Sequence, residues 1–63
     1  MENKSKSYVL DYQVKNNPNY NYKEEFDTVK LAMERAMFVQ NMFNVDGVVT
    51  VLDDDGDIVV EVE

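Results

Sequence analysis

Carboxylates are the side chains through which this sequence could do chemistry. The 63-residue chain holds thirteen Asp and Glu residues but no histidine and no cysteine. It therefore has no thiol nucleophile, imidazole base, disulfide or zinc site of the usual sulfur and nitrogen type. Paired carboxylates can hydrolyse glycosides, but so small a domain offers no deep cleft in which the pKa of one carboxyl group would be raised. We expect a protein that is not an enzyme, with no catalytic residue and no cofactor.

The acidic residues are distributed unevenly along the chain. Residues 1–43 hold six acids and all six bases, so their formal charge is zero, whereas residues 44–63 hold seven acids and no base. The whole net charge of −7 therefore comes from the C-terminal third. These acids, which we predict to bind a partner, are Asp46, Asp53, Asp54, Asp55, Asp57, Glu61 and Glu63. Residues two apart on a strand are about 6.6 Å apart on one face, so Glu61 and Glu63 would be spaced comparably to successive phosphates of a nucleic-acid strand.

The acidic segment has two other interpretations. Acidic turns and charged edge strands increase solubility and prevent aggregation, although surfaces of mixed charge are the usual solution. A calcium loop of the EF-hand type is not predicted. With Gly56 in the place of the EF-hand glycine, Val51 and Val62 stand where the first acid and the final bidentate Glu belong. We predict no metal site, and a weak cation site of another type stays open.

Charge and hydropathy also restrict the partners. Nucleic acid and anionic membranes repel a polyanion, so a basic protein is the favoured partner and direct nucleic-acid binding is not expected. No stretch of the chain approaches the 18 apolar residues of a membrane span, and the first seven residues lack the apolar region of a signal peptide. We expect the protein to act in a reducing cytoplasm, away from membranes.

A single domain, residues 1–63, is expected to position the acidic residues. Residues 1–6 are predicted to be a flexible N-terminus. Residues 7–14 alternate apolar and polar side chains and are predicted to form a strand. The Asn-rich and Pro-containing run 15–22 indicates a loop. Asn21 and Glu24 have the spacing of a helix N-cap pair, so we expect a helix over 22–44, where neither Gly nor Pro occurs.

The C-terminal third is predicted to be a β-hairpin. Residues 45–52 and 58–63 are rich in β-branched residues, and an Asp-Gly turn lies between them. The element order β-α-β-β predicts a small α+β domain, in which one long helix packs on one face of a three-stranded sheet. Ile58, Val60 and Val62 are expected to face the helix.

The predicted helix carries a second apolar stripe, roughly opposite the stripe expected to cover the sheet. Leu31, Phe38 and Met42 follow one another at i, i+7 and i+11, and Arg35 occupies i+4. A chain of about 60 residues buries only roughly 60 % of its unfolded surface and is marginally stable without a disulfide or metal. We therefore expect a homodimer with Leu31, Arg35, Phe38 and Met42 at its interface.

The acidic run 53–57, the Glu61-Val62-Glu63 end and the β-α-β-β pattern give the chain a resemblance to a known family. It resembles the small acidic DNA-mimic inhibitors of bacteriophages, in particular the host-takeover inhibitors of the histone-like nucleoid protein HU. The resemblance covers the whole chain in size, charge and pattern. It implies a homodimer that occupies the DNA-binding surface of a basic host protein at the bacterial nucleoid. The alternative is a small structural or regulatory homo-oligomerisation module whose acids keep it soluble.

Overall fold

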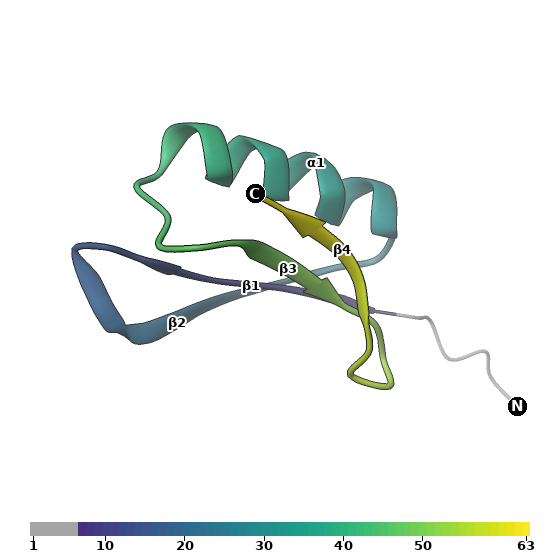
Figure 1. Ribbon diagram of the computed structural model, residues 1–63. Helices are drawn as coiled ribbons and strands as arrows, with labels where there is room; N and C mark the ends of the chain where they lie inside the picture. Colours follow the sequence, from purple (N-terminus) through teal and green to yellow (C-terminus); the bar gives the residue numbers. More distant parts are fainter. Residues whose placement is uncertain (1–6) are drawn as a thin grey trace, which may run out of the picture.

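Four antiparallel strands and one helix make up the fold of residues 7–63, the part of the chain that the computed structural model describes (Figure 1). The predicted flexible segment 1–6 lies outside these described residues. The elements are β1 (Tyr8–Val14), β2 (Asn17–Phe26), α1 (Val29–Met42), β3 (Val49–Leu52) and β4 (Ile58–Val62). They form one α+β domain whose sheet has the strand order β2-β1-β3-β4, with every neighbouring pair antiparallel.

The predicted three-stranded sheet is wrong, because the segment expected to be a loop and the start of a helix is strand β2. The turn is confined to Lys15 and Asn16, and β2 then pairs along β1, with Tyr22 opposite Tyr12. These two rings stack with their centroids 5.3 Å apart. Cross-strand aromatic pairs of this kind outweigh the turn preference of the asparagines. Pro18 is tolerated because β2 is an edge strand, where a missing N–H costs no ladder bond.

Helix α1 is shorter than predicted, spanning Val29–Met42 instead of residues 22–44. The N-cap is Thr28, whose Oγ1 accepts a hydrogen bond from the backbone N–H of Leu31 at 3.2 Å. Glu24 and Glu25, which we expected in the first helical turn, belong to β2. With 14 residues, α1 falls short of a membrane span, and no helix of residues 7–63 has the length and apolar character to cross one.

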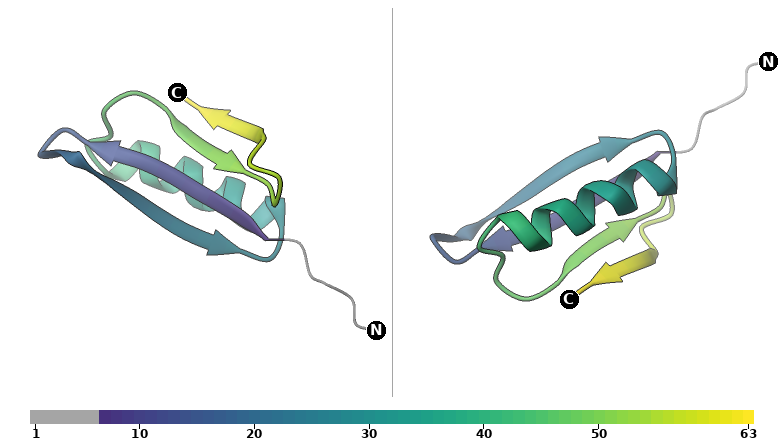
Figure 2. Two further views of the ribbon diagram at one scale, coloured as in Figure 1. Left: turned by 90° about the horizontal axis from the view of Figure 1, so that it is seen from below. Right: turned by 90° about the horizontal axis from the view of Figure 1, so that it is seen from above.

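The core lies between α1 and one face of the sheet. The helix contributes Ala32, Ala36 and Val39, which are fully buried. Figure 2 shows α1 running along the middle of the sheet, with β2 along one side and β3 and β4 along the other. The sheet residues beneath it are buried or nearly so; they are Leu10, Tyr12, Val45, Val49 and Val51. Because two of the helix contacts are alanines, the helix backbone can approach the sheet closely.

Two polar side chains fix the helix to the outer strands of the sheet. On one side, the Gln40 Nε2 atom donates to the Val62 carbonyl oxygen of β4 at 2.7 Å. On the other side, Arg35 donates from Nε to Glu24 of β2 at 3.1 Å. We therefore call the side of α1 that carries Gln40 its β4 flank, and the side that carries Arg35 its β2 flank.

Strands β3 and β4 form the predicted hairpin, with an irregularity in its register. Val51 pairs with Val60, but Leu52 pairs with Ile58, so the ladder contains a bulge. Val60 and Val62 pack against the core as expected. The expectation is wrong for Ile58, which is exposed, because the bulge shifts the start of β4 out of alternation.

Candidate functional site

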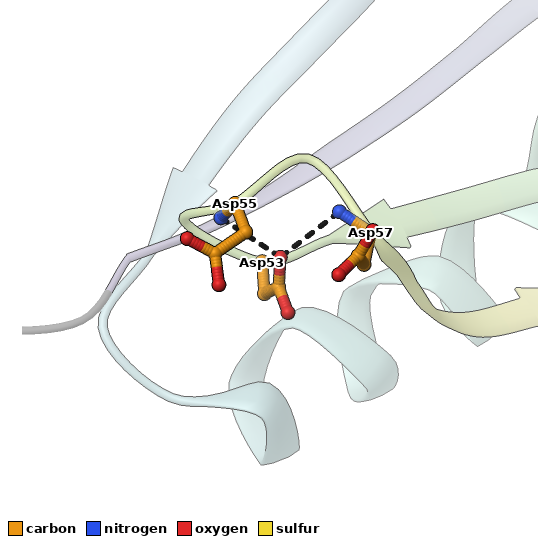
Figure 3. A group of neighbouring side chains, drawn as sticks. All are labelled: Asp53, Asp55 and Asp57. Atoms are coloured by element: carbon orange, nitrogen blue, oxygen red, sulfur yellow. Dashed lines mark hydrogen bonds between the residues drawn. The ribbon is translucent and has the colours of Figure 1, made fainter.

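The acidic turn between β3 and β4 is organised by one of its own carboxylates. The Asp53 Oδ1 atom accepts hydrogen bonds from the backbone N–H groups of Asp55 and Asp57, both at 2.9 Å (Figure 3). The backbone closes the turn with bonds from Gly56 to Asp53 and from Asp53 to Asp57. Gly56 has a φ of 87°, which other residues adopt at a cost. The predicted site residue Asp53 therefore holds the turn, while Asp55 and Asp57 are exposed.

The turn gathers three carboxylates into a small space. Oxygens of Asp53, Asp55 and Asp57 all lie within 4.8 Å of one another, a donor set of the kind that hard cations such as Ca²⁺ accept. One Asp53 oxygen already accepts two backbone hydrogen bonds. The weak cation site therefore stays an open alternative to the predicted absence of a metal site, and the cluster is first of all a concentration of negative charge.

Asp54, the remaining acid of the turn, contacts the beginning of the described chain. Its Oδ1 accepts from the backbone N–H of Ser7 at 2.8 Å and from the Ser7 hydroxyl at 3.3 Å. The acidic turn is thereby tied to the residue that precedes β1. Of the four acids in the turn, Asp53 and Asp54 thus have structural contacts that the sequence pattern does not indicate.

The face of the sheet turned away from α1 carries a second group of acids. The pairing register aligns Asp11 of β1 with Thr50 of β3, and Thr50 with Glu61 of β4. Their neighbours along the strands, Val49 and Val51, are buried beneath the helix, so this row lies on the open face. Lys23 of β2 is opposite Asp11 at the other end of the row. By the same alternation, Glu25 and Glu63 belong to this face.

A hollow of about 320 Å³ on the open face brings Asp46 and Asp11 together. Its lining also includes Gln13, whose side chain donates to the Asn21 side chain at 3.0 Å. Asn21 in turn donates to Asp11 at 3.3 Å. These bonds order the polar wall, and Val48 adds an apolar side. A hollow with two carboxylates and one apolar wall has the chemistry to accept a lysine or arginine side chain.

The structure divides the predicted acidic site into two parts. Asp46 precedes β3, and its backbone N–H donates to Gln13, whereas the turn 53–57 follows the other end of β3. Four strand residues separate these ends by roughly 13 Å. Glu61 lies on the open face between the two parts. Sequence reasoning missed Asp11 and Glu25; the signal for Asp11 is its place among the polar positions of the alternating strand.

The predicted dimer-interface residues lie on the β2 flank of α1. Leu31 is 50 % exposed, Phe38 45 % and Met42 66 %. Arg35 is half-buried, and its guanidinium carbon lies 5.0 Å from the centroid of the Phe38 ring. Its bonds to Glu24, at 3.1 and 3.4 Å, form the one ion pair found among residues 7–63. The three apolar side chains therefore line a surface instead of contributing to the core.

A series of ring contacts connects this flank of the helix to β2. Phe38 packs edge-on against Phe43, and Phe43 packs against Tyr12, with centroids 6.1 Å apart in both pairs. Tyr12 stacks on Tyr22, which meets exposed Tyr20 at 4.7 Å. Burial raises the pKa of the Tyr12 phenol, and the nearby Glu24 carboxylate raises it further. The result is one aromatic cluster that extends from α1, through the buried Tyr12 ring, to the edge of the sheet.

No known family model, curated protein or solved structure matches the chain.

Proposed function

We propose that the protein is a non-enzymatic DNA mimic that occupies the DNA-binding surface of a basic protein and so prevents DNA from binding. The observation that carries the proposal is the one-sided charge: residues 44–63 hold seven acids and no base, and Asp11 joins Asp46 and Glu61 on the open face of the sheet. The resemblance to bacteriophage inhibitors favours the nucleoid protein HU as the partner. The protein would then act at the nucleoid, in the cytoplasm of the host bacterium.

The sheet supports this function by holding its acids at regular intervals. Neighbouring strands lie about 4.8 Å apart and alternate residues about 6.6 Å apart along a strand. Asp11 and Glu61, with Thr50 between them, are thus spaced by roughly two strand widths. Acids fixed on strands lose less conformational freedom on binding than acids on a flexible tail, and this increases affinity. Their charge also accelerates encounter with a cationic surface.

The hollow between Asp11 and Asp46 supports the proposal in a different way. A bound arginine or lysine would place its aliphatic stem against Val48 and its charged end between the two carboxylates. Such a contact would anchor the acidic surface at one position and so give the protein a preferred orientation on its partner. Mimicry by charge alone would lack this orientation.

A displacement assay tests the proposal. HU is bound to a fluorescent DNA duplex, and the protein is added while fluorescence anisotropy reports release of the DNA. We expect release by the native protein, loss of release as salt is raised, and much weaker release by a variant with Asp55→Asn, Asp57→Asn and Glu61→Gln. Asp53 is left unchanged because it holds the turn.

The matched control makes the same change in net charge on the helix, away from the open face of the sheet. Glu34→Lys and Asn41→Lys, at two exposed positions of α1, also change the net charge by three units but leave residues 44–63 and the open-face acids intact. We expect this variant to retain most of the inhibition. Equal loss in both variants would show that only net charge matters, and undiminished inhibition by the first would refute the proposed array.

The second candidate function, a homo-oligomerisation module, is favoured by the exposed apolar flank of α1. Under that function the working surface is apolar, so Phe38→Glu removes activity and the acidic variants do not. Salt separates the two functions as well. High salt weakens binding between opposite charges, whereas it strengthens apolar association.

A further inference from the structure

The two edges of the sheet differ in length and in charge. Strand β4 has five residues, is irregular where it pairs with β3, and carries Glu61 with no nearby base. Two copies of this edge would repel each other. Strand β2 has ten residues and carries charges of both signs, because Lys23 is followed by Glu24 and Glu25. An exposed edge of this length offers a row of backbone donors and acceptors to another strand.

The apolar surface of the helix lies above this same edge. At 100° per residue, Leu31, Phe38 and Met42 all fall within about 60° of Arg35, the residue that bonds to β2. The ring contacts from Phe38 through Phe43 and Tyr12 to Tyr22 join the helix flank to the strand. The partly exposed Arg35–Glu24 ion pair joins the edge of β2 to the β2 flank of α1, so the two lie side by side on one surface.

The area of this surface is close to what a stable dimer needs. Its five most exposed large side chains are Tyr20, Leu31, Phe38, Met42 and Phe43. Side chains of this size that are about half exposed offer roughly 100 Å² each, or about 500 Å² together. A typical interface buries about 800 Å² on each partner, and the exposed edge of a ten-residue strand can supply much of the remainder. An apolar patch of this size is at the upper limit for a monomer.

We propose that a second copy of the chain occupies this surface, by pairing its β2 antiparallel to the first β2 about a two-fold axis. The product is one continuous eight-stranded sheet with both helices on the same face. Pairing centred on Glu24 places Lys23 opposite Glu25 of the partner subunit, and Tyr22 opposite Phe26 of the partner subunit. Each Glu24 near the axis remains neutralised by its own Arg35. This inference does not depend on the proposed DNA mimicry.

The first test measures the oligomeric state by size-exclusion chromatography with light scattering. We expect a dimer for the native chain, and a dissociation constant raised roughly thirty-fold or more by Phe38→Glu, as for a buried aromatic anchor. The matched control is Met37→Glu, a neighbour that is 51 % exposed but lies on the β4 flank of α1. It should remain dimeric. A monomeric native chain, or equal effects of the two substitutions, would overturn the proposal.

The second test does not depend on the folding of the Phe38→Glu variant. Because the chain has no cysteine, a short bismaleimide cross-linker can join two copies only through a single introduced cysteine. The yield of cross-linked dimer then reports whether that position lies close to the same position of the partner subunit. Lys23→Cys and Glu25→Cys on β2 should cross-link to dimers in high yield, and Glu61→Cys on β4 should not. Cross-linking through position 61 but not through β2 would place the interface on the β4 edge and would refute β2 pairing.

Discussion

Asp53 provides the sharpest test of how the acidic turn is built. Two substitutions, Asp53→Asn and Asp53→Ala, remove the same charge and relieve the same repulsion from Asp55 and Asp57. Only asparagine keeps an oxygen where Asp53 Oδ1 accepts two backbone hydrogen bonds at 2.9 Å. The difference between the two variants therefore isolates the two hydrogen bonds from the electrostatics of the cluster.

The size of the effect follows from those two bonds. Each is worth about 1 kcal/mol net when the acceptor is neutral, so the alanine variant should be about 2 kcal/mol less stable than the asparagine variant. A domain of this size has a total stability of roughly 3–9 kcal/mol. In small domains 1 kcal/mol corresponds to about 4–8 °C, so the difference in Tm should be roughly 8–16 °C.

Thermal unfolding followed by circular dichroism at neutral pH measures this difference. Relative to the native protein, the asparagine variant should lose stability as salt is added, because the repulsion that it relieves is then screened in the native protein as well. Melting of the two variants within about 2 °C of each other would show that the side-chain bonds of Asp53 contribute little. The turn would then be held by Gly56 and the backbone bonds alone.

Three further predictions concern the scaffold. Leu10→Ala should lower the free energy of unfolding by about 2–4 kcal/mol in urea titrations, because Leu10 is fully buried and its loss leaves a cavity; a change below about 1 kcal/mol would contradict this packing. Thr28→Ala should cost about 1 kcal/mol and Thr28→Ser much less, since only a hydroxyl can cap the Leu31 N–H; equal losses would rule out the cap. The native protein should lose stability as the pH rises above about 10, because the unfolded chain ionises Tyr12 before the folded chain does. Tyr12→Phe should reduce that alkaline loss in urea midpoints compared between neutral and alkaline pH, and an unchanged loss would assign it to other groups.

The β3–β4 hairpin could be predicted from the sequence because its signals are local. An Asp-Gly turn stands between two runs of β-branched residues, and nothing nearby competes with this pattern. Strand β2 was missed because two local signals conflict over the same residues. Tyr20, Tyr22 and Phe26 alternate as strand residues do, but the asparagines and Pro18 favour turns. Pairing with β1, which is not local information, decides between them.

The start of the helix was misplaced for a related reason. Glu24 and Glu25 are as favourable in a first helical turn as on an exposed strand, so their charges do not distinguish the two. Thr28 is the N-cap, but its signal is weaker than the acidic run that precedes it.

The candidate site could also be predicted only where its signal is local. The charge of residues 44–63 is visible in the sequence, whereas the approach of Asp11 to Asp46 depends on the strand order.

The contact between Gln40 and Val62 has a consequence for how the molecule responds to its medium. The helix is fastened to the acidic edge strand by an uncharged amide, and the core beneath it is apolar. One partly exposed ion pair, between Arg35 and Glu24, is found within residues 7–63. Ionic strength therefore acts on the outward-facing carboxylates far more than on the interior. The protein should release a cationic partner in concentrated salt while still folded, and regain it on dilution without any refolding step.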